Sequence, residues 1–458
     1  MLPAFAASPA YGADLWVDTS NPACSDARPA ALVAVPVTSW CTLAPAGAQA
    51  RAGDVVRILD GVYRGTLRPL NSGTPTAPIR FTAAEPGVVL DANGAANAVK
   101  LIGVSDIALD GMTIRGGTGQ GVWIDNSPRT SLARVEVTAN PGAGIQVKAT
   151  SGLVVDSSRI AANGSAGILE LAGTSGARYT ANTISANGIG GGIYGGDGIQ
   201  LGGTGALVAG NDISGNGDPG PYEHGIYTAA ASSGWTIQLN RLADNGGANL
   251  KAAGAAGIVR RNRMTNGRYG IVLSDNPAAV TVEHNVIDGR AQHLVFLTAG
   301  TTAARARLWA NTIVQTGRST TSGDASTVFV NAATSLEVRD NLLCYSNPDA
   351  LGVALWVNDA TRLGSLASDT NWTCATDATA RSFAWNGSRT TLAGWRTKSG
   401  QDARSVDSRP PTFDPNLRVT SPNLGLNRAD SLGLLEDYAG TPLPPAGSVD
   451  IGAYQHTG

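Results

Sequence analysis

A short segment recurs along the chain and constrains the fold more than any other feature: Gly, an apolar residue, any residue and a second apolar residue. The copies follow one another at spacings of 21 to 31 residues. They begin at Gly121, Gly144, Gly167, Gly198, Gly225, Asn249 and Gly270. Such a period is typical of solenoids, whose repeats bury their apolar side only by stacking on one another. The 458 residues therefore need not divide into several globular domains.

Each repeat contains short runs of residues in which apolar positions alternate, which indicates strands, and no sustained 3.6-residue pattern indicates helices. Because each repeat returns to the same place, neighbouring copies should pair in parallel and enclose a column of Val, Ile and Leu. The predicted fold class is all-β, a single-stranded parallel β-helix (solenoid). Its ends need caps against edge pairing.

A second recurring unit ends in Asn, and repeats in register would place these Asn residues in one column. The members are Asn182, Asn211, Asn240, Asn262, Asn285, Asn311 and Asn341. Stacked Asn amides satisfy one another and the backbone of a tight turn. We expect this column to be structural and to carry no chemistry.

The charge balance excludes one class of partner. Only 15% of the residues are charged and the net charge is −2, so a nucleic-acid binder that neutralises phosphates is excluded. No apolar stretch approaches the roughly 20 residues that cross a bilayer, and we expect no membrane partner. The sequence does not indicate an oligomeric state.

The four cysteines form one close pair near each end of the chain, Cys24 with Cys41 and Cys344 with Cys374. No CxxC motif occurs and no His lies beside a Cys, which favours two disulfides over metal ligation. The first 13 residues are rich in small side chains and look like the tail of a secretion signal. Together these features predict a secreted, extracellular protein, with export of the bacterial type.

The chain resembles secreted right-handed parallel β-helix proteins of the pectate-lyase-like superfamily. The residues that carry the resemblance are the repeats, Asp14-Leu-Trp-Val-Asp near the start and Asp450-Ile-Gly-Ala-Tyr near the end. The resemblance covers most of the chain. It implies a right-handed solenoid with an N-terminal cap and an irregular C-terminal segment. Many members act on polysaccharides, so the implied partner is a polysaccharide or an oligosaccharide.

Loss of the repeat pattern predicts the boundaries. Residues 1–13 are expected to be processing sequence, and residues 14–75 the N-terminal cap with the first strands. The cap should include a short helix over Thr42–Arg51. Coils are predicted over residues 76–346, and residues 347–458 should pack on the solenoid as a C-terminal segment.

Aligned repeats gather polar side chains on one face. The third residue of each copy should face solvent, because side chains alternate along a strand. We further expect the residue before each Gly to project outward. Six residues then form a patch over four coils: Asp197, Gln200, His224, Tyr227, Lys251 and Tyr269. Four neighbours complete the predicted substrate-binding set: Trp123, Gln146, Glu223 and Arg268.

This patch holds the groups that β-elimination of an acidic sugar needs: a cation for the uronate carboxylate, a base and a proton donor. His224 or Lys251 is expected to be the base, Tyr227 the proton donor and Asp197 a further catalytic residue. The favoured function is a secreted carbohydrate-active enzyme, a polysaccharide lyase. No cofactor is required, and calcium is the metal that the resemblance allows, although these coils lack the Asp cluster that holds it in other β-helix lyases.

Two alternatives remain open. Three strands, beginning at Gly196, His224 and Asn249, are similar to strands of polygalacturonases. This similarity implies an inverting glycoside hydrolase, in which Asp197 would be a catalytic carboxylate, His224 a helper and Lys251 a ligand of the substrate carboxylate. Gly198 replaces the second Asp of that family, so Glu223 or Glu170 would have to supply the other carboxyl group. The remaining alternative is a non-catalytic glycan-binding β-helix, with Trp123, Tyr227 and Tyr269 stacked on sugars.

Overall fold

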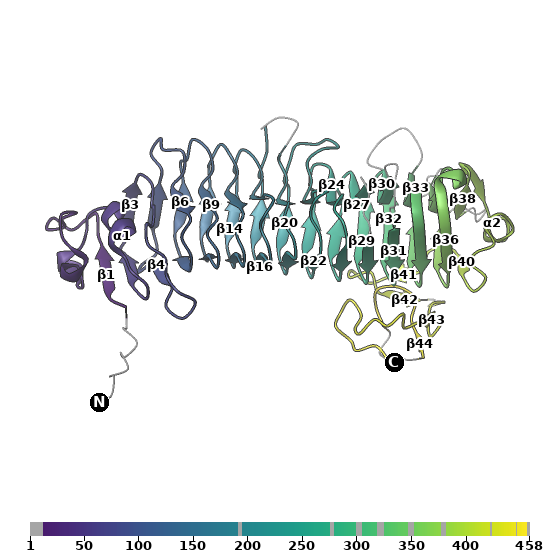
Figure 1. Ribbon diagram of the computed structural model, residues 1–458. Coiled ribbons are helices and arrows are strands. Elements are labelled where there is room, and N and C mark those ends of the chain that lie inside the picture. The colour runs from purple at the N-terminus through teal and green to yellow at the C-terminus, as the bar shows by residue number, and fades with distance from the viewer. Residues whose placement is uncertain are drawn as a thin grey trace, which may run out of the picture. The chain divides into compact units, whose positions relative to one another are not determined.

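The computed structural model describes residues 12–190, 195–274, 279–298, 305–317, 325–346, 352–376, 382–421, 424–445 and 447–455. The predicted processing sequence lies outside this part of the chain, apart from its last two residues. The chain divides into two compact units, Met1–Asn187 and Gly188–Gly458. In each unit, short strands stack in parallel ladders around an apolar interior (Figure 1). The predicted all-β solenoid is therefore confirmed.

The first unit contains three ladders of parallel strands. Ladder A comprises β1 (Asp14–Val17), β2 (Val55–Ile58), β4 (Ile79–Ala83), β7 (Ile107–Asp110), β10 (Ser131–Ala133), β13 (Val154–Asp156) and β16 (Arg178–Thr180). Ladder B comprises β3 (Gly61–Arg64), β5 (Val88–Asp91), β8 (Thr113–Arg115), β11 (Glu136–Thr138), β14 (Arg159–Ala161) and β17 (Thr183–Ser185). Ladder C comprises β6 (Val99–Ile102), β9 (Val122–Asp125), β12 (Ile145–Lys148) and β15 (Ile168–Glu170).

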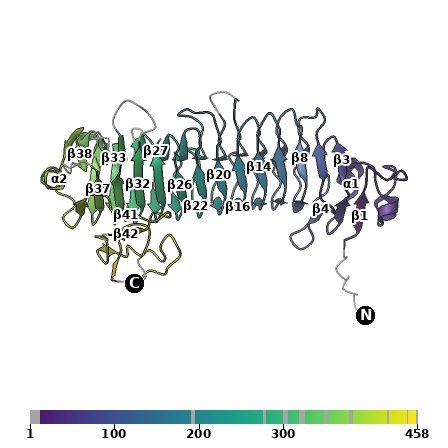
Figure 2. The same cartoon turned by 180° about the vertical axis from the view of Figure 1, so that it is seen from behind.

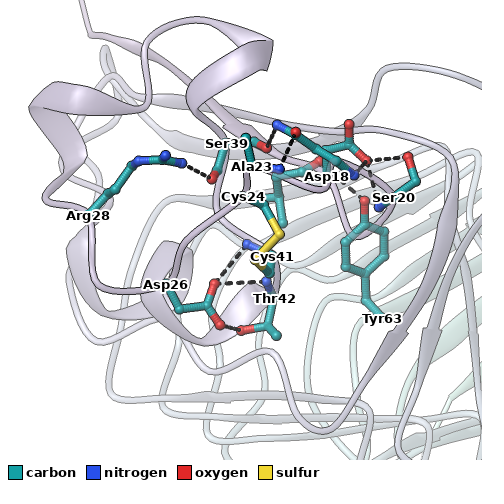
Figure 3. Close-up of a disulfide and its surroundings, with 12 residues drawn as sticks. Asp18, Ser20, Ala23, Cys24, Asp26, Arg28, Ser39, Cys41, Thr42 and Tyr63 are labelled. Atoms are coloured by element: carbon teal, nitrogen blue, oxygen red, sulfur yellow. Dashed lines mark hydrogen bonds between the residues drawn. A yellow bond between two sulfur atoms is a disulfide. The ribbon is translucent and has the colours of Figure 1, made fainter.

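The cap of the first unit holds the predicted short helix, α1 (Leu43–Gln49). The disulfide between Cys24 and Cys41 lies just before it, with 5.1 Å between the Cα atoms (Figure 3). The carboxylate of Asp26 accepts hydrogen bonds from the backbone N–H groups of Cys41 and Thr42, at 2.8 and 3.0 Å. The disulfide and Asp26 thus fix the chain at the start of α1.

The second unit continues the same design with longer strands. Ladder A comprises β19 (Leu207–Ala209), β22 (Trp235–Gln238), β25 (Gly257–Arg260), β28 (Val280–Glu283), β31 (Arg305–Trp309), part of β33 (Ala325–Arg339) and β36 (Leu363–Asp369). Ladder B comprises β20 (Asp212–Ser214), β23 (Arg241–Ala243), β26 (Arg263–Thr265), β29 (Val286–Arg290), β32 (Thr312–Gly317), β34 (Leu342–Tyr345), β37 (Trp372–Ala375) and β40 (Val406–Ser408). Ladder C comprises β18 (Ile199–Leu201), β21 (Ile226–Thr228), β24 (Ala248–Ala252), β27 (Tyr269–Ser274), β30 (His293–Thr298), the rest of β33, β35 (Gly352–Val357) and β38 (Phe383–Trp385).

The coils extend beyond residue 346, where the sequence pattern places their end. The strands β35, β36, β37 and β38 still pair in parallel with the preceding coil. β35 still begins with the repeat pattern, as Gly352-Val-Ala-Leu, whereas β38 follows Ser382 instead of a Gly. A second helix, α2 (Leu392–Ser399), follows them. No helix in the described part of the chain is long and apolar enough to cross a membrane.

The predicted Asn column is confirmed in the second unit. The side-chain amide of each Asn donates to the Oδ1 atom of the next, at 2.9 to 3.1 Å. The column runs through Asn211, Asn240, Asn262, Asn285, Asn311, Asn341 and Asn371. In the first unit, Asn182 lies at the matching turn and accepts from the backbone N–H of Ser158.

The C-terminal segment folds back on the coils of its own unit (Figure 2). It contains the short pairs β41 (Thr412–Phe413) with β42 (Val419–Ser421) and β43 (Ala429–Asp430) with β44 (Ser448–Val449). The backbone N–H of Ala453 donates to Oγ1 of Thr312 at 2.9 Å. Apolar residues of the segment join a cluster with Leu342 and Trp372 of the coils.

That cluster also contains the second disulfide, between Cys344 and Cys374. The two residues are register partners on β34 and β37, and their Cα atoms lie 4.5 Å apart. Both predicted disulfides are therefore confirmed.

Candidate functional site

The strand register of the second unit brings the predicted outward residues together. Gln200 is paired with Tyr227, Tyr227 with Lys251, and Lys251 with Val272, along ladder C. Gln200, Tyr227 and Lys251 are partly exposed, as expected for the third position of the repeat. The row formed by these three residues is called the ladder C row below.

Asp197 and His224 do not project outward, contrary to the prediction. Each is only 3% exposed, and the backbone N–H of His224 donates to Oδ1 of Asp197 at 2.7 Å. The residue before the repeat Gly lies where the chain turns into ladder C, beneath the turn of the next coil. The backbone N–H of Ala248, in that next turn, donates to Nδ1 of His224 at 3.0 Å.

Glycine makes this close packing sterically feasible. A Cβ atom at Gly247 would lie 2.8 Å from Nδ1 of His224, and one at Gly196 would lie 2.7 Å from the carboxyl carbon of Glu223. Neither contact would fit a larger side chain without movement. The two glycines therefore let neighbouring turns close over the buried polar groups.

The loops before Asp197 and His224 are tied to each other. The backbone N–H of Gly190 donates to the carboxylate of Asp218 at 3.0 Å, and the N–H of Asp218 donates to Oε2 of Glu223 at 2.5 Å. Glu223 is itself buried. These contacts join the loop before Asp197 to the loop before His224 through Asp218 and the buried Glu223.

The hydrogen bond from Ala248 defines the state of His224. A backbone N–H can only donate, so Nδ1 is an acceptor and the proton of the neutral ring lies on Nε2. Burial, reinforced by the charge of Lys251, lowers the pKa of His224 to about 3. His224 is thus a neutral hydrogen-bond donor at physiological pH, which argues against the predicted role as a base.

Among the residues of this site, Asp197 has a pKa near neutral pH. Burial raises its pKa to about 7; the charge of Glu223 raises it further, while the N–H of His224 and the charge of Lys251 oppose the shift. These electrostatic effects place the carboxyl groups of Asp197 and Glu223 and the ammonium of Lys251 in one cluster. A carboxyl group with a pKa near 7 can give or take a proton under ordinary conditions.

Tyr227 connects the buried pair to the exposed row. Its ring centroid lies 6.0 Å from that of His224, and Nζ of Lys251 lies 5.3 Å from the Tyr227 centroid. The ammonium of Lys251 therefore lies over the ring of Tyr227, and that ring lies near His224. This arrangement offers a cation, a proton donor and a titratable carboxyl group within three successive coils.

Three predicted residues belong to the first unit. Glu170 points into the solenoid interior, where Tyr179 donates to its Oε2 at 2.8 Å, and this contact argues against the predicted role as a catalytic carboxylate. Gln146 is 9% exposed and accepts from the amide of Gln120 at 3.0 Å. Trp123 is partly exposed and is the register partner of Gln146.

Arg268 and Tyr269 lie at the start of the coil that contains β27, and the coil after it holds residues that the sequence pattern missed. The phenol of Tyr269 donates to Oε1 of Gln292 at 3.0 Å, and its ring stacks on Phe296 with centroids 5.4 Å apart. His293 is buried and is the register partner of Tyr269. The coil that contains β30 begins His-Leu-Val-Phe instead of Gly-Ile, so the repeat pattern could not identify it.

Tyr269 is poorly placed to act as a sugar-stacking platform. Phe296 packs against its ring, and the guanidinium carbon of Arg268 lies 5.7 Å from its centroid. Among the residues that the structure describes, no group of three or more His, Cys, Asp or Glu side chains could hold a metal ion.

Comparisons with known proteins agree with the fold. The family described as the right-handed β-helix region matches residues 91–201 and 193–316. The chain is therefore a right-handed parallel β-helix protein, as the sequence predicts. No curated protein sequence matches it significantly.

Solved structures of the same architecture are distant in sequence. A complex of XylC with xylose aligns over 96% of this chain and 98% of its own, with 10% identity and a TM-score of 0.56. An alginate lyase from Paenibacillus sp. str. FPU-7 aligns over 62% and 91%, with 16% identity and a TM-score of 0.42. A GH136 lacto-N-biosidase from Eubacterium ramulus aligns over 64% and 67%, with 14% identity and a TM-score of 0.45. The similarity to XylC supports the fold and leaves the function to be argued from the site.

Proposed function

We propose that this protein is a secreted carbohydrate-active enzyme that cleaves glycosidic bonds at the ladder C row of its second unit. One observation carries the proposal: the ammonium of Lys251 lies 5.3 Å from the Tyr227 ring centroid, and its charge acts on a buried Asp197 whose pKa is raised to about 7 by burial. Strongly shifted groups beneath exposed polar side chains are typical of functional sites. The xylose bound to XylC is consistent with a sugar ligand for this fold, and the two disulfides favour an extracellular location.

β-Elimination remains the favoured reaction, with roles revised by the geometry. The ammonium of Lys251 would neutralise the uronate carboxylate, which acidifies the neighbouring C–H. Asp197, ionisable near pH 7, matches proton abstraction better than His224, whose Nδ1 is occupied. The phenol of Tyr227 would protonate the leaving oxygen, and Nε2–H of His224 would hold the substrate or the phenol in place.

Hydrolysis is the second candidate, because two carboxyl groups interact at this site. The negative charge of Glu223 contributes to the raised pKa of Asp197, so one carboxyl group keeps a proton while the other is ionised. A protonated acid and an ionised carboxylate are the pair that glycoside hydrolysis needs. In this mechanism Asp197 would be the acid and Glu223 the base.

Product analysis distinguishes the two reactions. Purified protein is incubated with a panel of acidic and neutral polysaccharides, and the masses of the products are measured by mass spectrometry. Elimination gives an unsaturated sugar, whereas hydrolysis gives a product heavier by one water. Lys251→Ala and Tyr227→Phe should each lower turnover by about 100-fold or more. The matched control Lys398→Ala, on α2, should keep full activity.

Binding without cleavage of any polysaccharide would overturn the enzymatic proposal in favour of a glycan-binding β-helix. Full activity in both Lys251→Ala and Tyr227→Phe would instead show that the reaction occurs at another place.

A further inference from the structure

A hollow lies on ladder A of the second unit, on a different ladder from the site proposed for cleavage. Its volume is about 490 Å³, which falls in the range typical of small-molecule sites. It spans the adjacent strands β28, β31, β33 and β36, and none of the three residues of the ladder C row lines it. The hollow is therefore a candidate binding site that the proposed cleavage does not use.

Two arginines on β31 point to the same side of ladder A and line the hollow. Arg305 and Arg307 are both exposed, whereas Ala306 between them is buried, as expected where side chains alternate along a strand. Residues two positions apart on a strand are separated by about 6.6 Å. The two guanidinium groups can therefore face one ligand that lies between them.

The protein neutralises these two cations to different extents. Nε of Arg307 lies 3.5 Å from Oε1 of Glu337, and the guanidinium carbon of Arg307 lies 5.0 Å from the ring centroid of Trp309. The described part of the chain offers Arg305 no ion pair. The lining of the hollow thus carries the charges of both arginines against the single carboxylate of Glu337. This excess of positive charge favours an anionic ligand.

Hydroxyl groups flank the arginines on both neighbouring strands. Thr281 on β28 is the register partner of Arg307, and Ser335 on β33 is the register partner of Arg305. Adjacent strands lie about 4.8 Å apart, so the four side chains surround one part of the hollow from different directions. Neither hydroxyl group is hydrogen-bonded within the described residues, and each can donate to a ligand.

Such an arrangement of donors fits a tetrahedral oxyanion better than a planar one. A carboxylate carries its two oxygens in one plane, whereas a phosphate or sulfate group has oxygens that point in several directions. A guanidinium group can donate paired hydrogen bonds to two of these oxygens, and hydroxyl groups on neighbouring strands can donate to the others.

We propose that this cluster of two guanidinium groups and two hydroxyl groups binds a phosphate or sulfate group, either as the free ion or as an ester on a sugar. The cluster consists of Thr281, Arg305, Arg307 and Ser335. The inference goes beyond the proposed function and does not depend on it, because no residue of the ladder C row takes part. Glu337 limits the affinity, since its carboxylate competes with the ligand for Arg307.

Equilibrium dialysis of the purified protein against radiolabelled inorganic phosphate or sulfate, at constant ionic strength, measures this binding. At least one of the two ions should bind saturably and more tightly than radiolabelled acetate, whose carboxylate is planar. Arg305→Gln should lower the affinity for that ion by about tenfold or more, because it removes a charged donor. Glu337→Gln should raise the affinity by about two- to fivefold, because it releases Arg307 and removes a negative charge.

Arg241→Gln is the matched control, since it removes the same charge from ladder B of the same unit. It should leave the affinity unchanged. Circular dichroism should give Arg305→Gln the melting temperature of the wild type, because Arg305 is exposed. Absence of saturable binding, equal affinity for acetate, an unchanged affinity in Arg305→Gln, weaker binding in Glu337→Gln or an equal loss in Arg241→Gln would overturn the site.

Competition distinguishes the two sources of the ligand. Glucose 6-phosphate and glucose 6-sulfate are added to the protein with its bound radiolabelled ion. Displacement by an ester at lower concentration than by the unlabelled free ion identifies a sugar ester as the ligand, whereas displacement only at higher concentration identifies the free ion.

Discussion

At the scale of single residues, His224 shows how a buried polar group is held neutral. Its Nδ1 accepts from Ala248 N–H, and its pKa is lowered to about 3 by burial. In the unfolded chain the same ring titrates near 6.5. Between these two pH values the native state therefore binds fewer protons than the unfolded state. The contribution of the neutral His224 ring to stability is lost as pH falls from about 6.5 toward 3.

Replacing His224 by Asn should weaken this pH dependence. The Oδ1 atom of Asn can take over the acceptor role of Nδ1 but does not titrate, so the melting temperature should fall less between pH 7 and pH 4.5 than in the wild type. Thermal unfolding followed by circular dichroism measures the difference. His224→Leu is the comparison variant, because it leaves Ala248 N–H unsatisfied and should be about 1–3 kcal/mol less stable than His224→Asn at every pH. Identical pH dependence in His224→Asn and the wild type would contradict the assignment.

Asp197 leads to a prediction about activity. If its carboxylate is the base, activity should rise with pH through about 7; if it is the acid of a hydrolase, activity should fall above about 7. Glu223→Gln removes a negative charge that raises the pKa of Asp197, so in the lyase mechanism this limb of the pH profile should move to lower pH. In the hydrolase mechanism Glu223 is the base, and the same variant should lose its activity. Rates measured from pH 5 to 9 check the shift. A limb that stays in place would show that Asp197 does not control it.

At the scale of elements, the Asn column organises the turn between ladders A and B in the second unit. The residue before each Asn has a positive φ, for example 54° at Arg261 and 49° at His284. Non-Gly residues in this conformation are strained by about 1–2 kcal/mol each. The stacked amides offset this strain, since each one joins its own turn to the turns on either side.

Asn262→Ala removes one side-chain amide from the middle of the Asn column. Asn262 accepts from the backbone N–H and the amide of Asn240, both at 3.0 Å, and these donors would be left buried and unsatisfied. We expect the free energy of unfolding to fall by about 3 kcal/mol, measured by urea denaturation. The exposed Asn358 is the control, and Asn358→Ala should change stability by less than about 0.5 kcal/mol. Equal losses in both variants would show that stacking contributes nothing beyond solvent-exposed bonds.

The same elements show what could be predicted from the sequence. The register of Gln200, Tyr227 and Lys251 follows from Gly-Ile-x-Leu alone, because strand alternation is local. The burial of Asp197 and His224 could not be predicted, since it depends on a turn one coil away and on the space left by Gly247. His293 and Gln292 were missed because their coil replaces the Gly start with other residues while keeping the same pairing.

At the scale of the whole molecule, each unit contains one disulfide, and the two disulfides differ in their exposure to solvent. Cys24 and Cys41 are partly exposed in the N-terminal cap, whereas Cys344 and Cys374 are fully buried under the C-terminal segment. Thiol–disulfide exchange requires a thiolate to reach a sulfur atom, so access should control the order of reduction.

Mild reduction of the native protein should therefore open the disulfide between Cys24 and Cys41 first. Alkylation followed by mass spectrometry of the peptides should find label at Cys24 and Cys41, while Cys344 and Cys374 remain bridged until the protein is unfolded. Addition of denaturant is the positive control, since all four residues should then react. Reduction of both disulfides at equal rates without denaturant would mean that the C-terminal segment does not shield Cys344.

The Asn column also affects how such a chain can change in length during evolution. Asn262 and Asn285 lie 23 residues apart, and within the column the amide of each bonds to the Asn residues of the two adjacent coils. Duplicating one full coil would add a rung identical in kind and leave every amide paired, whereas inserting half a coil would leave two rungs without partners. Gene duplications of about one period should thus be tolerated here, and the residues that face a substrate could be multiplied along the row without redesigning the core.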